Sequence, residues 1–304
     1  MIEPFECTDC QTVYEPIKFK GRCSCGGYFL PAARVRPLSA KDILSDTASL
    51  WRYKEFFLPD RNEDWKEITA GEGFTPLISL DKDNPSILLK LEFLSPLGGF
   101  HDRGYAVLAA MLKHFGANAA GIYPKTEQER LAWRTYVQRA GIKGCPDEAG
   151  AEPYDHPFFL TGIQTFAYEI WEQLSGKKLE FIVLPAGDPS LALGTFLGFK
   201  QLAESKLIEE YPAFLLMEKE GATTENLSSF MKEQILRILE ITNGKRISIA
   251  QAEIIQAQKA LHSRAIKSNE DDAFLYAGFM RYYRDHSIKD QRAILPIGLT
   301  NGGL

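Results

Sequence analysis

The sequence predicts an α/β protein in which a mostly parallel sheet is covered by helices on both faces. Short apolar runs have the composition of buried strands, namely 87–89 with Leu91, 181–184, 214–217 and 294–297. Segments with a helical period lie between these runs. Strands that alternate with helices along a chain are typical of a sheet built from parallel strands.

Three helices are predicted from an apolar stripe or a pair of capping residues at the start. The stripe is clearest over 162–175, where Gly176 provides a stop signal. The capping pairs are Thr161 with Gln164 for this helix, Thr126 with Glu129 for a helix that ends near 140–141, and Ser248 with Gln251 for a helix over about 249–264.

Composition and charge exclude several classes of protein. The 304 residues are 45% hydrophobic and 25% charged, which is ordinary for a globular protein. The net charge is −5, from 40 acidic and 35 basic residues, and this argues against a nucleic-acid partner. No apolar run approaches the length of a membrane span, and no signal peptide is recognisable. A cytoplasmic protein with reduced thiols is therefore expected.

Four of the five cysteines lie within the first 25 residues and form two pairs. Two residues separate Cys7 from Cys10, and one residue separates Cys23 from Cys25. Thiolates paired on tight turns suit a tetrahedral zinc ion, and a short segment with little core needs such a crosslink. The sequence predicts a structural, zinc-ribbon-like arm. The alternative is four free thiols, because the second pair is one residue shorter than the usual zinc knuckle.

Several further motifs follow one another along the chain. Residues 49–59 are followed by GEGFTPL at 71–77, and residues 89–104 read LKLEFLSPLGGFHDRG. Further matches are found at 156–170, at 184–190 with 198–200, and at 299–304. Together these motifs resemble threonine synthases of the tryptophan-synthase-β superfamily, the fold-type II pyridoxal-phosphate (PLP) enzymes. Residues 89–104 resemble the family pattern K-x-E-x-x-N-P-T-G-S-F-K-D-R-G.

This resemblance implies the fold-type II architecture, in which mostly parallel sheets are flanked by helices. It divides the chain into an arm and linker at 1–37 and a PLP-enzyme-like domain at 38–304. Residues 105–145 would be a remnant of the small mobile subdomain. The interval before His156 is shorter than in the family. Much of the domain that closes over the substrate is therefore expected to be absent.

The resemblance places His101 at the position of the lysine that binds PLP as an aldimine. A primary amine forms this imine, whereas an imidazole cannot. Asp102, Arg103 and Gly104 keep the family pattern, and their expected role is structural.

The turn that grips the substrate carboxylate in the family corresponds to residues 124–128. Glu127 stands in place of a glycine there, and Gln128 in place of the asparagine that lies against the cofactor ring. A carboxylate at a helix start stabilises the helix but competes with an anionic ligand. Gln128 stays a candidate cofactor contact because it keeps an amide.

The family's phosphate loop corresponds to GDPS at 187–190. Pro189 has no N–H to donate, and Asp188 adds a negative charge beside the expected phosphate. Gly187 and Ser190 remain candidate anion contacts, although Ser190 is equally suited to cap a helix. Thr300 matches the residue that faces the pyridine nitrogen, or it simply ends a buried strand.

These changes favour a threonine-synthase-like pseudoenzyme that is retained for binding. Its partner would be a second copy, an active homologue or a small anionic ligand, and its cofactors a structural zinc ion and at most non-covalent PLP. An alternative is altered chemistry with His101 as acid or base. A third is an active PLP-dependent lyase that uses another lysine, Lys125 or Lys200.

Overall fold

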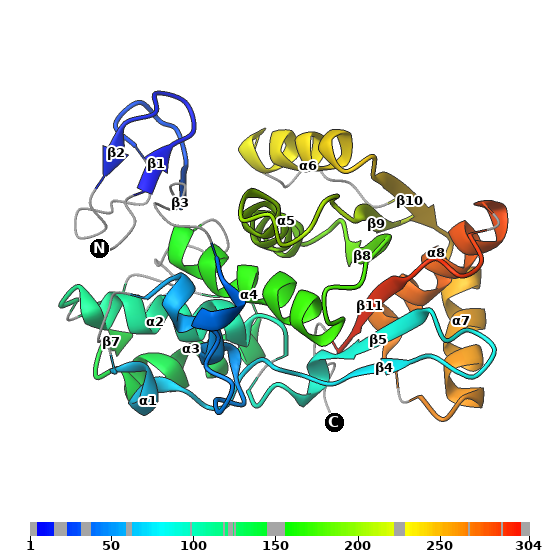
Figure 1. The fold of residues 1–304 in the computed structure, drawn as a ribbon, viewed down its shortest axis with the longest axis horizontal. Coiled ribbons are helices and arrows are strands. Elements are labelled where there is room, and N and C mark those ends of the chain that lie inside the picture. Colours follow the sequence, from blue (N-terminus) through cyan, green and yellow to red (C-terminus); the bar gives the residue numbers. More distant parts are fainter. Residues whose placement is uncertain are drawn as a thin grey trace. The chain divides into compact units, whose positions relative to one another are not determined.

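The computed structural model describes residues 5–14, 23–31, 38–58, 63–97, 99–117, 119–120, 124, 126–144, 156–221, 229–266, 268–286 and 288–298. The chain forms two compact units (Figure 1). Unit 1 comprises Met1–Phe74 and Ser95–Glu169, and unit 2 comprises Thr75–Leu94 and Ile170–Leu304.

Unit 2 is built around a six-stranded sheet in the order β10-β9-β8-β11-β5-β4. Its strands are β4 (Leu77–Ser79), β5 (Ile87–Leu91), β8 (Phe181–Pro185), β9 (Ala213–Lys219), β10 (Lys245–Ile249) and β11 (Ala293–Ile297). All neighbouring pairs are parallel except β4 with β5, which is antiparallel. The four apolar runs form β5, β8, β9 and β11, so the mainly parallel sheet is confirmed.

Helices cover both faces of this sheet, as predicted. They are α5 (Pro189–Glu204), α6 (Ser229–Ile241), α7 (Gln251–Ser263) and α8 (Glu270–His286), and a short 3-10 helix, η4 (Glu92–Leu94), follows β5. Figure 1 shows α5 and α6 on one side and α7 and α8 on the other. Contacts of α5 with β8 and of α8 with β8 to β11 bury the central strands, whose residues are almost all apolar.

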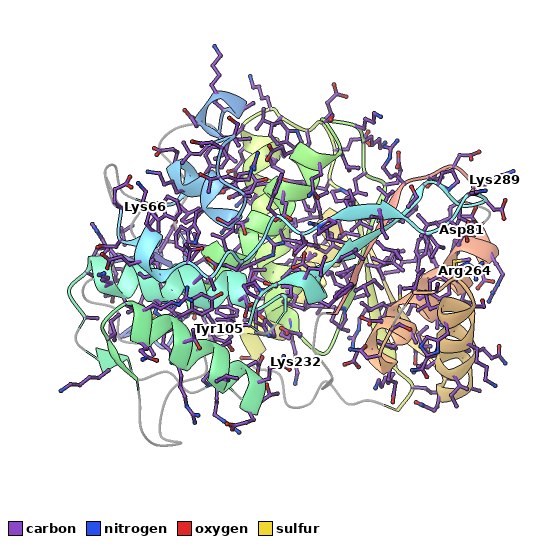
Figure 2. All side chains as sticks on the ribbon, turned by 90° about the horizontal axis from the view of Figure 1, so that it is seen from below. Lys66, Asp81, Tyr105, Lys232, Arg264 and Lys289 are labelled. Carbon is purple, nitrogen blue, oxygen red and sulfur yellow. The ribbon has the colours of Figure 1, made fainter. Side chains whose placement is uncertain are left out.

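A surface ion pair ties two segments of unit 2 together. Arg264, which follows α7, donates to Asp81 in the β4–β5 turn over 2.8 Å, and Figure 2 labels the two residues next to each other. The hydrogen bond from Arg264 holds the pKa of Asp81 below its usual value. Such partly exposed pairs contribute little to the free energy of unfolding. We therefore attribute most of the stability of unit 2 to the buried contacts of its sheet.

Unit 1 consists of a small sheet and a group of helices. The sheet is antiparallel in the order β2-β1-β3, from β1 (Phe5–Cys7), β2 (Val13–Tyr14) and β3 (Phe29–Pro31). The other elements are η2 (Ala40–Asp42), η3 (Leu50–Phe56), α1 (Trp65–Ile68), α2 (Asp102–His114), β6 (Ala119–Ala120), α3 (Glu127–Arg139), β7 (Lys143–Gly144) and α4 (Pro157–Gln173, of which residues up to Glu169 belong to this unit).

Two glycines allow α2 and α4 to approach closely. A Cβ on Gly104 would lie 2.4 Å from the ring of Phe159, and one on Gly162 would lie 2.1 Å from the carbonyl oxygen of Arg103. A side chain at Gly104 would displace the Phe159 ring, and one at Gly162 would displace the backbone of α2. The start of α2, and with it His101, is therefore held directly against α4.

The start of α4 differs from the prediction. The helix begins at Pro157 rather than near residue 162, and Thr161 lies inside it, donating its hydroxyl to the carbonyl of Pro157 over 2.9 Å. Thr161 and Gln164 are therefore not a capping box. The N–H of Phe158 is instead accepted by Nδ1 of His156 over 3.1 Å, and proline suits the first helical position.

The other two predicted helix starts give one confirmation and one correction. Thr126 and Glu129 form a reciprocal capping box at the start of α3. Ser248, however, lies in β10, and α7 begins at Gln251. There the carboxylate of Glu253 accepts from the N–H of Ala250 over 3.1 Å. Among the described residues, no helix is long and apolar enough to cross a membrane.

Candidate functional site

The four N-terminal cysteines come together at the small sheet of unit 1. Sγ of Cys7 lies 3.5 Å from Sγ of Cys25, and Sγ of Cys10 lies 3.6 Å from Sγ of Cys23. All four sulfur atoms are within 4.8 Å of one another. Zinc–thiolate bonds of about 2.3 Å in a tetrahedron place sulfurs about 3.8 Å apart. The cluster is therefore compatible with a zinc ion held by four thiolates.

The cysteine cluster is linked to the start of α4 by aromatic contacts. Phe5 is on the same strand as Cys7, and its ring lies 4.8 Å from that of Phe158 and 6.2 Å from that of His156. A metal ion that orders β1 would therefore also stabilise the N-terminal cap of α4.

We expect the purified protein to carry one zinc ion per chain and Cys10→Ser to lose most of it. The three thiolates left in Cys10→Ser cannot complete the tetrahedral coordination of zinc. Because structural zinc sites fold together with their metal, loss of the ion should also loosen the arm. Native mass spectrometry measures the metal, and amide exchange should rise in β1 and at the start of α4. Ser24→Ala, in the same turn as Cys23 and Cys25, should keep the ion. Unchanged zinc content in Cys10→Ser would contradict the assignment.

His101 lies at the start of α2, where only 8% of its side chain is exposed. Its Nδ1 lies 2.8 Å from Oε1 of Glu129 in the first turn of α3. The other carboxylate oxygen of Glu129 accepts from the N–H and the hydroxyl of Thr126 over 3.0 and 2.8 Å. The two helix starts are therefore joined by a buried imidazole–carboxylate contact.

The carboxylate of Glu129 is stabilised in its ionised form. Burial raises its pKa, but the hydrogen bond and charge of His101, together with Thr126, outweigh burial and lower the pKa to about 2. A depressed carboxyl pKa stabilises the fold above the unfolded-state value of about 4.3, and this contribution is lost as the pH falls toward 2. The carboxylate that contacts His101 is thus ionised at neutral pH.

Aromatic side chains surround the imidazole. The ring of His101 lies 5.8 Å from that of Phe159 and 6.4 Å from that of Tyr105, which in turn lies 5.9 Å from Trp133. All three aromatic side chains are buried. This apolar environment strengthens the attraction between His101 and Glu129 relative to water.

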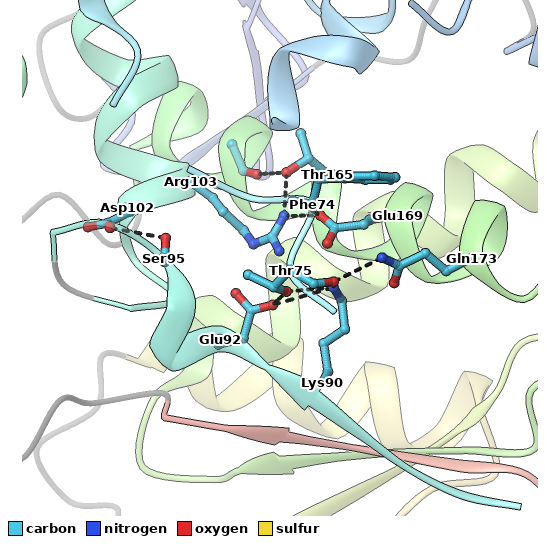
Figure 3. Close-up of polar contacts among 11 residues, drawn as sticks. Phe74, Thr75, Lys90, Glu92, Ser95, Asp102, Arg103, Thr165, Glu169 and Gln173 are labelled. Atoms are coloured by element: carbon cyan, nitrogen blue, oxygen red, sulfur yellow. Dashed lines mark hydrogen bonds and ion pairs between the residues drawn. The ribbon is translucent and has the colours of Figure 1, made fainter. Parts of the chain in front are cut away.

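The motif residues that follow His101 make structural contacts. Asp102 accepts from the N–H of Leu97 over 2.8 Å and from the hydroxyl of Ser95 over 3.0 Å, which fixes the loop before α2. Nη1 of Arg103 lies 2.6 Å from Oε2 of Glu169 on α4, and neither side chain is exposed (Figure 3). The structural role expected for the D-R-G part of the motif agrees with these contacts.

The K-x-E part of the same motif forms a buried cluster in unit 2. Nζ of Lys90 donates to the carbonyl and hydroxyl oxygens of Thr75 and lies 3.9 Å from Glu92 (Figure 3). The hydroxyl of Thr75 donates to Glu92 over 2.6 Å, and Gln173 donates to the carbonyl of Thr75 over 2.9 Å. Lys90 and Glu92 are fully buried, so this lysine is an ion-paired core residue.

The GEGFTPL motif also contributes to the core. The carboxylate of Glu72 accepts from the indole of Trp51, from the N–H of Ala70 and from the hydroxyl of Tyr136 on α3. Burial raises the pKa of Glu72, and the hydrogen bonds from Ala70 and Trp51 lower it in part. Trp51 of the motif at 49–59 and Glu72 of the motif at 71–77 therefore meet in unit 1.

The remaining predicted site residues lie in different parts of the chain. Gln128 is half-buried in the first turn of α3, next to Glu129. Gly187 and Ser190 lie at the start of α5 in unit 2. Ser190 does not cap this helix, because Asp188 occupies the N-cap position and accepts the Ser190 hydroxyl over 2.5 Å. Thr300 lies outside the described residues.

Glu129 as the partner of His101 was not foreseen from the sequence. The capping box that contains it was recognisable, but 28 positions separate the two residues. Only the packing of α3 against α2 brings them together.

His156 predicts a distinct pH dependence of stability. Burial lowers its pKa to about 3, whereas an unfolded histidine titrates near 6.5. A depressed histidine pKa stabilises the fold above 6.5, and this contribution is lost as the pH falls below that value. We expect acidification from pH 8 to 4.5 to cost roughly 2–3 kcal/mol through this residue.

His156→Asn keeps an acceptor for the N–H of Phe158 but cannot gain a proton. Its free energy of unfolding, measured in urea at both pH values, should fall less on acidification than that of the wild type. Glu129 titrates below this range in the native protein and cancels in the comparison. Equal losses in both proteins would show that His156 is not buried in its neutral form.

A surface hollow in unit 2 is a poor candidate for a charged ligand. It has a volume of about 270 Å³ and lies between β10 and the end of α8. Neighbouring groups already contact its cations: Arg246 pairs with Glu218, Arg281 with Glu253, and Lys245 donates to His286 over 3.3 Å. His286 accepts through Nε2, because its Nδ1 donates to the carbonyl of Tyr282.

Comparisons with known proteins agree with this fold. No family model matches the chain. It is 24% identical to the threonine synthase of Methanocaldococcus jannaschii over 71% of this chain and 65% of that protein. It is 26% identical to the threonine synthase of Halalkalibacterium halodurans over 62% of this chain and 65% of that protein. The chain therefore matches about 65% of the length of these relatives.

Solved structures show the same architecture. The processed form of threonine deaminase isoform 2 from Solanum lycopersicum superposes with a TM-score of 0.57 at 16% identity, covering 76% of this chain and 79% of that one. A pyridoxal 5'-phosphate-dependent aspartate racemase also gives 0.57, at 16% identity over 79% of this chain and 94% of that one. The protein has the fold of the fold-type II PLP enzymes. Its curated relatives at low identity are threonine synthases.

Proposed function

We propose that this protein is a threonine-synthase-like pseudoenzyme that acts by binding rather than by PLP chemistry. The observation that carries the proposal is the buried contact between His101 and Glu129 over 2.8 Å. The motif match aligns His101 with the family's PLP lysine, and its imidazole offers no primary amine. PLP therefore does not fit this position as an aldimine.

The pattern of retained and changed residues supports the same proposal. Lys90, Glu92, Asp102 and Arg103 are retained from the family motif, and all of them make buried structural contacts. The motif also differs from the family pattern at Ser95, Leu97 and Gly99, and His101 stands at the position of the lysine that has the chemical role in the family. Residues that hold the fold together are retained and the PLP lysine is replaced, as expected when selection maintains the fold but no longer maintains catalysis.

The lysines named as alternatives receive no support as replacements. Lys200 is half-exposed on α5 and lies 3.8 Å from Glu204, one turn further along. Lys125 lies outside the described residues. A catalytic lysine needs a fixed approach to the cofactor aldehyde, which a solvated surface side chain does not provide.

The proposal is tested by assaying threonine formation from O-phosphohomoserine with added PLP. We expect no turnover by the wild-type protein, while an active threonine synthase serves as the positive control. PLP-dependent threonine formation that His101→Ala does not change would establish an active enzyme that uses another lysine, and it would overturn the proposal.

Under this proposal the partner is a second copy of the chain or an active homologue. In the first turn of α3, Glu127 and Glu129 already pair with cationic or imidazole groups of this chain, and this favours a protein partner over a small anion at that turn. Light scattering of the protein alone and mixed with an active threonine synthase distinguishes the two partners. A strict monomer in both samples would contradict a partner role.

The same contact favours a second candidate function, acid–base catalysis by His101. An imidazole oriented by a carboxylate at Nδ1 has the geometry of a general base. The test is exchange of the α-proton of amino acids in D₂O, followed by proton NMR with and without PLP. Exchange that His101→Ala abolishes would support this function, and exchange that survives the change would exclude it.

A further inference from the structure

The carboxylate of Glu129 lies where three hydrogen-bond donors converge. They are Nδ1 of His101 at 2.8 Å, the backbone N–H of Thr126 at 3.0 Å and the Thr126 hydroxyl at 2.8 Å. Two of the donors belong to the start of α3 and the third to the start of α2. Donors at a helix start that converge in this way are typical of sites for carboxylates and phosphates.

The second carboxylate in the first turn of α3, that of Glu127, does not compete with Glu129 for the donors on His101 and Thr126. Glu127 is 71% exposed and pairs with Arg130 over 2.9 Å and with Arg134 over 3.7 Å. Glu129 is the contrasting residue on this turn, because only 12% of its side chain is exposed and it faces His101. The two side chains are chemically identical and differ in their position and exposure, which makes Glu127 a matched control.

Because the contact between His101 and Glu129 is buried, the three donors can bind only one anionic group. His101 is enclosed by Phe159 and Tyr105, and a charge in such surroundings must be balanced by an opposite one. One carboxylate satisfies the donors. A second anion would be repelled by Glu129 at this place.

We infer that Glu129 is a built-in ligand, whose carboxylate fills an anion site formed by His101 and the start of α3. Shortening this side chain opens the site to a small external carboxylate. This inference rests on the proposed function and deepens it. It names small anions as the ligand class that the native protein rejects at the site of His101 and Glu129.

The experiment is chemical rescue of Glu129→Ala by acetate. The variant should unfold at a lower temperature than the wild type, and acetate should restore part of the loss with a saturable dependence. Sodium chloride at equal ionic strength should not. The wild type, and Glu127→Ala as matched control, should respond equally to the two salts. A response of Glu129→Ala that is the same in acetate and chloride overturns the inference.

Two further variants keep the test decisive. In His101→Ala/Glu129→Ala the acetate-specific response should fall at least several-fold, and an undiminished response would remove His101 from the site. If Glu129→Ala does not fold, Glu129→Gln keeps the size of the side chain. The Nδ1–H proton resonance of His101 should then shift in Glu129→Gln and stay unchanged in Glu127→Gln. An unshifted resonance in Glu129→Gln contradicts the inference.

The outcomes separate this inference from the proposed function. Covalent capture of PLP by the wild-type protein would overturn the pseudoenzyme proposal, whatever acetate does to Glu129→Ala. Failure of acetate rescue would overturn the built-in ligand and leave the pseudoenzyme proposal standing.

Discussion

Arg103→Met is expected to lower the free energy of unfolding by about 3–5 kcal/mol. The change leaves the carboxylate of Glu169 buried without its guanidinium partner, which lies 2.6 Å away in the native protein. The same carboxylate oxygen also accepts from the N–H of Phe74 over 2.8 Å. A hydrogen bond from an amide compensates a buried charge only in part. Guanidinium chloride unfolding measures the loss, and amide exchange should rise in α2 and α4.

The double variant Arg103→Met/Glu169→Gln is the control for this result. It removes both charges and keeps an acceptor for the N–H of Phe74, so it should recover at least half of the loss. A loss below about 1 kcal/mol in the single variant would place the pair in the range of a solvated surface interaction. That result would contradict the structural role of the motif arginine.

Lys90→Met is expected to cost a similar amount, about 3–5 kcal/mol, in unit 2. The change leaves Glu92 fully buried, with the hydroxyl of Thr75 as donor but without the ammonium group 3.9 Å away. Amide exchange should rise in β5 and β11, which pair along their whole lengths. Unfolding by denaturant gives the loss in the free energy of unfolding.

Lys90→Met/Glu92→Gln isolates the effect of the unpaired charge. Glutamine keeps an acceptor for Thr75, and replacement of a buried ion pair by uncharged residues is often close to neutral. The double variant should therefore be more stable than Lys90→Met. A double variant that is less stable than the single one would indicate that hydrogen-bond geometry, rather than charge, determines the cost.

Under the proposed function, the two pairs explain how parts of a family motif persist without the family's chemistry. Lys90 and Arg103 lie on either side of His101 in the motif, and loss of either cation would leave a buried carboxylate without its charge partner. Selection for the fold alone preserves them. A residue whose only role is to bind a cofactor is under no such constraint, and in our proposal His101 has taken up a contact within the protein instead.

The strands were predictable because buried parallel strands are continuous apolar runs. The runs at 181–184 and 294–297 became β8 and β11 with little change in their bounds. The start of α4 was misplaced because Thr161 and Gln164 imitate a capping box inside a helix. The true cap, His156 followed by Pro157, relies on an imidazole acceptor that capping rules do not include.

Within the candidate site, local patterns were predictable and long-range contacts were not. The spacing of Cys7, Cys10, Cys23 and Cys25 already indicated one cluster, because each pair lies on a tight turn. The contact of His101 with Glu129 depends on how α2 and α3 pack. Neither residue carries a local signal for the other, so only the tertiary structure brings them together.

The central claim is that PLP cannot form an aldimine in this protein, and reduction with borohydride tests it most directly. The protein is titrated with PLP while its absorption spectrum is recorded, then reduced, and its intact mass is measured. The account predicts no aldimine band that saturates at one equivalent and no gain in mass. A stoichiometric gain of one reduced cofactor, mapped by peptide mass to a single lysine such as Lys200, would contradict it.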